Sequence, residues 1–130
     1  AGGGTPAFMS PELCEGRALD AGQGALADVW ALGVTVYMLS VGSLPFKSNK
    51  MLDLMGKIIH DPLVFPAAPE LHPELRDLVE GMLRKDPAER LTLRATAAHP
   101  WLQSDRYRRG VVWAPGGGGV RAAPGGGGAR

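Results

Sequence analysis

The stretch DVWALGVTVYMLSV, residues 28–41, is apolar on every face of the helix that it would form. A helix without a polar face is stable only where other elements surround it. Gly42 is a typical residue for ending such a helix, and Pro45 prevents it from continuing. The stretch therefore predicts a central buried helix. Its apolar run is shorter than the roughly 20 residues that a membrane span needs.

Two helices with one apolar side are expected to follow. Ser48 is a suitable cap for a helix that runs to about His60, with its apolar residues at helical spacing. Pro73 opens the clearest amphipathic helix of the chain. Its apolar residues follow the spacing i, i+3, i+4, i+7 and i+8, and are Leu75, Leu78, Val79, Met82 and Leu83.

Two short helices are predicted near the end of the chain. Residues 86–89, Asp-Pro-Ala-Glu, have the arrangement of a capping box and predict one turn of helix. Thr92 is expected to cap a last helix that ends at His99-Pro100, after which Trp101 returns to the core. Because no segment alternates apolar and polar residues as a strand does, the sequence predicts a mainly α fold.

The central helix has too few neighbours within this sequence. Each surrounding helix supplies about one apolar stripe, which is too little to enclose a helix that is apolar all round. We therefore interpret the chain as part of a larger core, with one side of the central helix uncovered. We expect parts of one set of residues to be exposed there, namely Val29, Trp30, Val34, Tyr37, Met38 and Val41.

Composition divides the chain at about residue 104. Residues 1–104 carry the helical patterns, whereas residues 105–130 are mostly Gly, Ala, Pro, Val and Arg and are expected to be a disordered low-complexity tail. Arg106, Arg108 and Arg109 form a small basic cluster that we interpret as solvated surface.

Charge and cysteine content restrict the classes of partner. The formal net charge of +1 gives no whole-chain case for binding nucleic acid or an anionic membrane. A single cysteine, Cys14, excludes an internal disulfide framework and a site built on several thiolates, and it favours a cytoplasmic location. The histidines are not at ligand spacing, so we expect no metal site and structural roles for all three.

Five short motifs occur in a fixed order along the chain. They are GTPAFMSPE at residues 4–12, DVWALGV at 28–34, LPF at 44–46, DPAERL at 86–91 and HPWL at 99–102. Each motif alone is a weak signal. Together, in this order and spacing, they resemble the protein kinase C-lobe from the end of the activation segment through the last helix, with Ser in place of Ala in the closing A-P-E triplet.

The resemblance implies structural roles for three charged residues. Glu12 is expected to pair with Arg90 and hold the activation segment on the lobe, because a planar guanidinium can bind a carboxylate through two hydrogen bonds. Asp28 is expected to accept hydrogen bonds from the backbone of the catalytic loop. An acidic residue there is also explained by the positive end of the helix dipole alone.

The resemblance also implies a substrate-facing segment. Thr5 matches the threonine that links the substrate-binding loop to the catalytic Asp and Lys, although a simple turn residue is the alternative. Phe8 and Met9 match positions that line the pocket for the substrate residue after the phosphoacceptor. Plain core packing explains those two side chains equally well.

Within the kinases, the motifs are similar to those of the calcium/calmodulin-dependent protein kinase kinases, which phosphorylate the activation loops of other kinases. Tumour-suppressor-type kinases that activate AMP-activated kinase share GTPAF and come second. The resemblance implies a protein substrate, which can be another kinase. It also implies ATP and Mg as cofactors of the parent enzyme, and none bound by this chain. No basic amphipathic helix follows Trp101, so calmodulin binding is not supported by this sequence.

The sequence contains none of the kinase signatures for nucleotide and catalysis, which are G-x-G-x-x-G, V-A-I-K, H-R-D and D-F-G. We therefore assign no catalytic, cofactor-binding or metal residue to it. The first hypothesis is that the chain is part of an active Ser/Thr kinase that phosphorylates other kinases. The alternatives are a truncated non-catalytic kinase-like module that binds substrates or regulators, and, more remotely, an unrelated helical domain.

The first prediction is that the isolated chain neither binds Mg-ATP nor transfers phosphate, because it carries no residues for either step. Radiolabelled phosphate transfer and thermal unfolding with and without Mg-ATP measure this directly. A stabilisation of even ~1 kcal/mol, which a few-fold excess of ligand over its Kd produces, would contradict the prediction.

Overall fold

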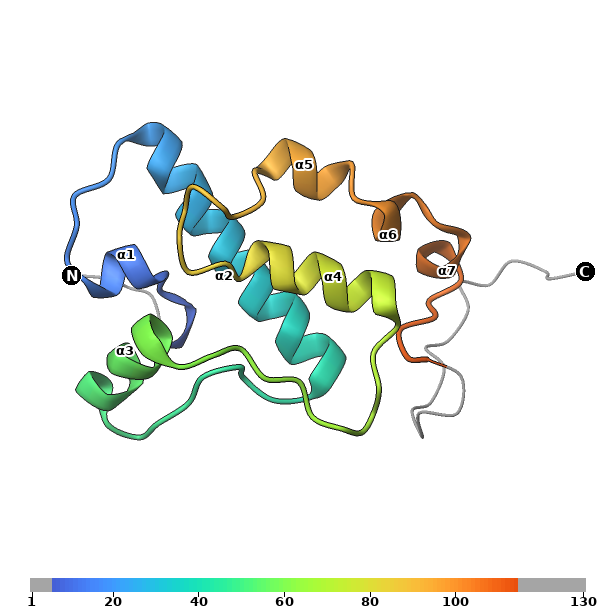
Figure 1. Ribbon diagram of the computed structural model, residues 1–130, viewed down its shortest axis with the longest axis horizontal. Coiled ribbons are helices and arrows are strands. Elements are labelled where there is room, and N and C mark those ends of the chain that lie inside the picture. Colours follow the sequence, from blue (N-terminus) through green and yellow to red (C-terminus); the bar gives the residue numbers. More distant parts are fainter. Residues whose placement is uncertain (1–5, 115–130) are drawn as a thin grey trace, which may run out of the picture.

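The long helix α2 (Ala21–Val41) runs through the middle of the fold, and the other elements pack around it (Figure 1). The computed structural model describes residues 6–114. Before α2 come the 3₁₀ turn η1 (Pro6–Phe8) and α1 (Pro11–Cys14). After it come α3 (Met51–His60), α4 (Pro73–Met82), α5 (Leu93–Ala97), α6 (Pro100–Gln103) and α7 (Asp105–Arg108).

The central helix begins earlier than the sequence predicts, at Ala21 and not at Asp28. Its first turn is closed by a capping box, in which Gln23 N donates to Asp20 Oδ1 (2.8 Å) and Asp20 N donates to Gln23 Oε1 (3.0 Å). At the other end Gly42 adopts φ = 91°, a left-handed conformation that glycine adopts without strain. The predicted C-terminal cap is therefore present.

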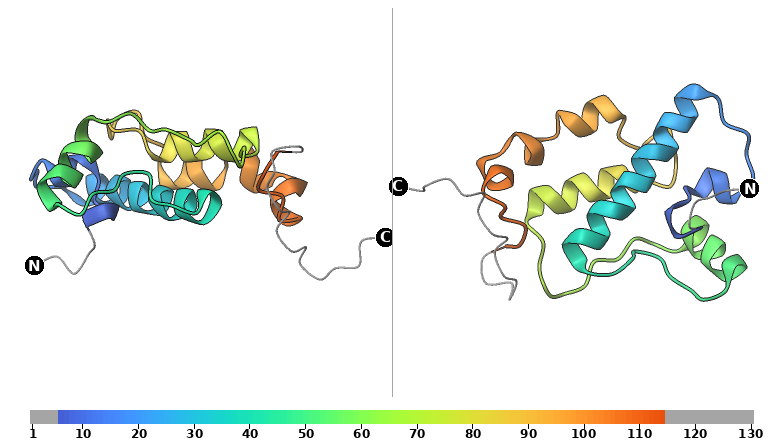
Figure 2. Two further views of the ribbon diagram at one scale, coloured as in Figure 1. Left: turned by 90° about the horizontal axis from the view of Figure 1, so that it is seen from below. Right: turned by 180° about the vertical axis from the view of Figure 1, so that it is seen from behind.

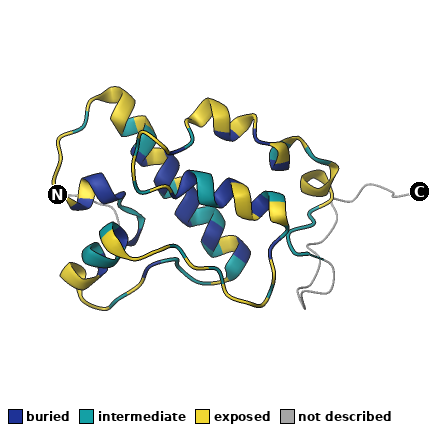
Figure 3. Ribbon diagram, in the orientation of Figure 1, coloured by how far each residue is buried: buried dark blue, intermediate teal, exposed yellow. Residues whose placement is uncertain are grey.

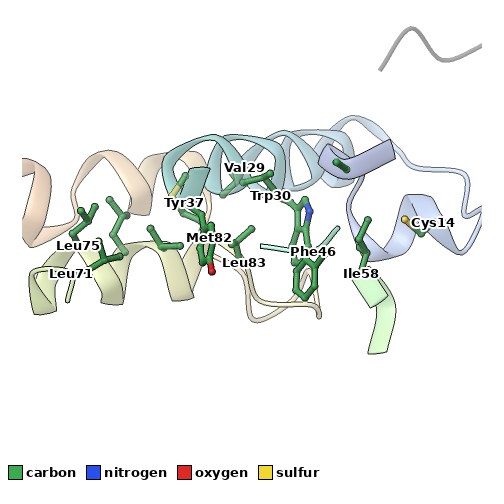
Figure 4. Close-up of a cluster of buried hydrophobic side chains, with 14 of the residues drawn as sticks. Cys14, Val29, Trp30, Tyr37, Phe46, Ile58, Leu71, Leu75, Met82 and Leu83 are labelled. Atoms are coloured by element: carbon green, nitrogen blue, oxygen red, sulfur yellow. The ribbon is translucent and has the colours of Figure 1, made fainter. Parts of the chain in front are cut away.

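The core forms between α2 and the elements on one of its sides (Figures 2 and 4). The apolar side chains that are most fully enclosed are Val29, Trp30, Val34, Ile58, Val79 and Met82. Helix α4 supplies its predicted apolar stripe to this core, and Phe46 stacks on Trp30 with their ring centroids 6.2 Å apart.

Four of the six residues in the set expected on the uncovered side of α2 are enclosed instead. Val29, Trp30, Val34 and Tyr37 are buried, because α4 and the Phe46 loop cover them. Met38 and Val41 are only partly exposed. The apolar side chains that α2 does expose are Leu32 and Leu39, at 43% and 76%. In Figure 3 the buried residues lie mainly in the middle of the fold, and the start of α2 is exposed.

By length and composition α2 is the one helix within residues 6–114 that could also cross a membrane. A buried core helix meets the same criteria. In this fold α2 places Trp30, Val34 and Tyr37 inside the helical core, which accounts for its apolar sequence.

Local capping differs from the prediction at two places. Helix α3 starts after Lys50, whose N–H donates to the hydroxyl of Ser48 (3.1 Å), so Ser48 stands just outside the cap position. Residues 86–89 form a hydrogen-bonded turn and not a helix, with Ala88 N donating to Asp86 Oδ1 (2.9 Å). Thr92 caps α5 as predicted, through a 3.0 Å hydrogen bond from Ala95 N.

The folded part of the chain continues beyond residue 104, where the sequence predicts the start of the tail. Helix α7 follows directly, and Trp113 then returns to α2, where its Nε1 donates to the carbonyl of Ser40 (3.1 Å). Trp113 also forms an isolated antiparallel bridge with Leu71. Apart from this single bridge, residues 6–114 contain no β-strand, which confirms the mainly α fold. The rest of the predicted tail lies outside the described residues.

The second prediction concerns Gly33, where α2 meets the end of α4. A Cβ at this position would lie 2.8 Å from Met82 Cβ and 2.9 Å from Leu83 Cδ2, so Gly33→Ala is expected to destabilise the fold by about 1–3 kcal/mol through overpacking. Gly24 is in the same helix with nothing within 4 Å of its Cβ position. Gly24→Ala should therefore stabilise the chain by roughly 0.5–1 kcal/mol.

Urea unfolding followed by circular dichroism measures both changes. A Gly33→Ala variant that is as stable as Gly24→Ala would show that α2 and α4 do not approach so closely.

Candidate functional site: a buried ion pair behind the substrate-facing segment

The structure brings Glu12 and Arg90 together, although they are 78 residues apart in sequence. Arg90 Nη1 donates to Glu12 Oε2 (2.7 Å) and Nη2 donates to Oε1 (2.9 Å), which is the bidentate geometry that the resemblance implies. The Glu12 and Arg90 side chains are 2% and 0% exposed. The pair therefore ties α1, at the start of the described chain, to the turn before α5.

The guanidinium of Arg90 has every donor occupied. In addition to the two bonds to Glu12, Nη1 donates to the carbonyl of Leu26 (2.9 Å) and Nη2 to that of Lys85 (3.2 Å). Nε donates to the carbonyl of Arg84 (2.9 Å). Because an arginine has five N–H donors, no part of this buried charge is left unsatisfied.

The ionised form of Glu12 is favoured in this environment. Burial by itself raises the pKa of the carboxyl group, but the hydrogen bonds and charge of Arg90, with backbone and Ser10 contributions, outweigh it and hold the pKa below its ordinary value. The residues next to Glu12 and Arg90 in the sequence set the position of each side chain. Pro11 opens α1 just before Glu12, and Arg90 N donates to the carbonyl of Asp86 in the Asp-Pro turn (3.1 Å).

Aromatic rings and a second cation pack beside the ion pair. The Arg90 guanidinium lies 5.3 Å from the centre of the Trp30 ring system, and the ammonium of Lys85 lies 4.3 Å from the Phe46 ring. Figure 4 shows Trp30 and Phe46 side by side at this end of the core. Lys85 is a site residue that the sequence analysis missed. Its only signal is its position directly before the Asp86-Pro87 turn.

The proposed substrate-facing residues lie on η1 and just after it. Phe8 and Met9 are half-buried and pack against the core, and η1 contacts both α2 and α3. Thr5 lies outside the described residues. Asp28 is exposed, and its side chain makes no hydrogen bond to another residue in the range 6–114. The catalytic loop that the resemblance assigns to Asp28 is not part of this sequence.

Two of the histidines have structural roles, as predicted. The Nδ1 atoms of His72 and His99 accept backbone N–H groups at the starts of α4 and α6 (3.2 and 3.0 Å). His99 Nε2 also lies 2.7 Å from Asp77 Oδ2. Burial, with the charges of Glu12 and Glu15, raises the pKa of the Cys14 thiol, which agrees with a packed and unreactive role. Within residues 6–114 no cluster of acidic, histidine and cysteine side chains fits a metal ion.

Comparison with known proteins identifies the class. The protein kinase domain family matches residues 2–102, so this chain belongs to the protein kinase family. It is 46% identical over 102 residues to the serine/threonine-protein kinase GRIK1 of Arabidopsis thaliana. It is 44% identical over 102 residues to the calcium/calmodulin-dependent protein kinase kinase of Caenorhabditis elegans, and 43% identical over 101 residues to the serine/threonine-protein kinase ssp1 of Schizosaccharomyces pombe.

These alignments cover most of this chain but little of the relatives. They include 78%, 78% and 75% of the chain, and 24%, 19% and 15% of the three relatives in the same order. The chain therefore spans about a quarter or less of the length of these proteins. Its family membership is established for residues 2–102, which include the elements from η1 to most of α6.

The third prediction concerns the ion pair. Glu12→Gln and Arg90→Met are each expected to reduce the free energy of unfolding by roughly 3–5 kcal/mol, because each leaves a buried charge or its hydrogen-bonding groups without a partner. The double variant should lose much less than the sum, since both changes break the same contact. The exposed pair Arg17–Glu15 is the control, and Glu15→Gln should change stability by at most about 1 kcal/mol.

The same pair predicts an acid dependence. Since the folded-state pKa of Glu12 is lowered, its stabilising contribution is complete above the ordinary glutamate value of about 4.3 and is lost as the pH falls through the lower folded value. Glu12→Gln should remove that part of the acid sensitivity in urea unfolding measured at a series of pH values. For the third prediction, losses of unfolding free energy that add up in the Glu12→Gln, Arg90→Met double variant would show that the two side chains do not meet.

Proposed function

We propose that this chain is the substrate-facing helical part of a Ser/Thr kinase catalytic domain that phosphorylates the activation loops of other kinases. The Glu12–Arg90 pair carries this proposal, because it fixes the segment with Phe8 and Met9 on the helical core in the way that the kinase resemblance implies. The name of the Caenorhabditis elegans relative, a protein kinase kinase, supports a kinase as the class of substrate.

In this proposal the chain contributes positioning and not phosphoryl-transfer chemistry. The substrate residue after the phosphoacceptor packs on Phe8 and Met9, and Thr5 links this segment to the catalytic Asp and Lys of the parent domain. Phosphoryl transfer itself requires groups that hold ATP, Mg and the reacting hydroxyl. The kinase signatures that supply these groups do not occur in this sequence, so we assign no step of the transfer to this chain.

The fourth prediction tests this role in a chimera. In the Caenorhabditis elegans relative, the region aligned with residues 2–102 is replaced by those residues of this chain. The chimera is expected to phosphorylate the activation-loop threonine of a recombinant substrate kinase. Phe8→Ala should lower kcat/KM by roughly tenfold for a peptide with an apolar residue after the threonine, and by much less for one with glycine there.

Leu13→Ala is the matched control, because Leu13 is a large apolar residue nearby on α1 but is 36% exposed. It should leave both peptides unaffected. A folded chimera that does not transfer phosphate would refute the proposal. In that case the non-catalytic, substrate- or regulator-binding module becomes the better hypothesis.

A further inference from the structure

Lys85 connects α3 to the aromatic end of the core. Its ammonium donates a hydrogen bond to the carbonyl of Ile58, in the last turn of α3. The same ammonium lies 4.3 Å from the Phe46 ring and 5.7 Å from the Trp30 ring. A cation suits both contacts, because the end of a helix and the face of an aromatic ring are each negative.

Helix α3 has few other links to the rest of the fold. It packs mainly on α1 and η1, and Figure 1 shows these elements together at one end of the molecule, away from α6 and α7. Ile58 is fully buried, so the last turn of α3 is the part that enters the core. The Lys85 amine therefore holds α3 at the point where it joins the rest of the structure.

The same lysine borders a surface cavity of about 330 Å³. The other walls include Glu15 and Arg17 on one side, Ile59 of α3, and Asp86. Because Lys85 lines this cavity, its side chain is reached from the surface, and the cavity is large enough for an acyl group. Burial lowers the pKa of Lys85 by more than the negative charge of Asp61 raises it, so more of this amine is neutral and nucleophilic near neutral pH than in an exposed lysine.

We propose that Lys85 is an acylation site whose modification by an acyl thioester loosens α3. The neutral amine attacks the carbonyl carbon of the thioester, the C–N bond forms, and the C–S bond breaks. The thiolate leaves, and the amine proton passes to water. The product amide is uncharged, so the attraction to Phe46 and Trp30 is lost, and only one N–H remains for the carbonyl of Ile58. The proposal does not depend on the kinase function proposed above.

The fifth prediction tests the reactivity. The full 130-residue chain contains four lysines, Lys47, Lys50, Lys57 and Lys85, which serve as internal comparisons. With acetyl-coenzyme A near neutral pH, peptide mapping by mass spectrometry should find Lys85 acetylated at least about threefold faster than the exposed Lys47 and Lys50. The advantage should disappear above the ordinary lysine pKa of about 10.4, where every amine is neutral and burial disfavours Lys85.

In urea the lysines should react alike, because the cavity and the burial are lost. Lys85 reacting no faster than Lys47 near neutral pH would overturn the proposal, as would an advantage that persists in urea.

Hydrogen exchange then tests the consequence for α3. Lys85→Gln, which imitates the acylated side chain, should increase amide exchange in residues 51–60 severalfold, while Lys85→Arg, which keeps the charge, should change it little. Lys50→Gln is the matched control, because Lys50 is exposed beside the start of α3. Unchanged exchange in α3 with Lys85→Gln would also overturn the proposal. If that variant unfolds as a whole, exchange rises in α2 and α4 as well, and the rates of acetylation decide.

Discussion

The arrangement of the whole fold depends on one buried contact, the bidentate pair between Glu12 and Arg90. Removing two charges from water is unfavourable, and the attraction between them offsets this only when the geometry is good and the remaining hydrogen-bonding groups are satisfied. Here the carbonyls of Leu26, Arg84 and Lys85 take the donors that Glu12 leaves free. One side chain therefore fixes α1, the start of α2 and the turn before α5 relative to one another.

Cations and aromatic rings from distant parts of the sequence alternate in space beside this pair. Arg90 lies by Trp30, Trp30 stacks on Phe46, and Lys85 lies over Phe46. The aromatic rings provide a partner for cations that have been removed from water, and the cations in turn keep the rings in place. The indole N–H of Trp30 is buried without a hydrogen-bond partner among the described residues, so this packing also offsets the desolvation of a polar group.

Much of this could be predicted from the sequence, because the signals were chemical or periodic. The apolar run at residues 28–41 predicted the central helix, and the motifs around Glu12 and Arg90 predicted their pairing. The true start of α2 at Ala21 was missed, since Gly and Ala carry no apolar periodicity and Gln replaces the usual Glu of a capping box. A helix that is apolar all round does not reveal which side will be covered, so four of the six residues in the set expected on the uncovered side are buried instead. The contact of Trp113 with α2 was not predicted, because one tryptophan beside a Gly-rich stretch forms no periodic pattern.

The segment 84–90 is where two parts of the fold meet. Its Arg90 reaches α1, and its Lys85 reaches the last turn of α3, the helix that packs on η1, so both helices are attached through seven consecutive positions. The Asp86-Pro87 turn gives this segment a fixed shape through backbone hydrogen bonds from Glu89 and Arg90 to Asp86. The position of Phe8 and Met9 is thus determined by residues near the other end of the domain. A change in the turn can alter the surface around Phe8 and Met9 without contacting it.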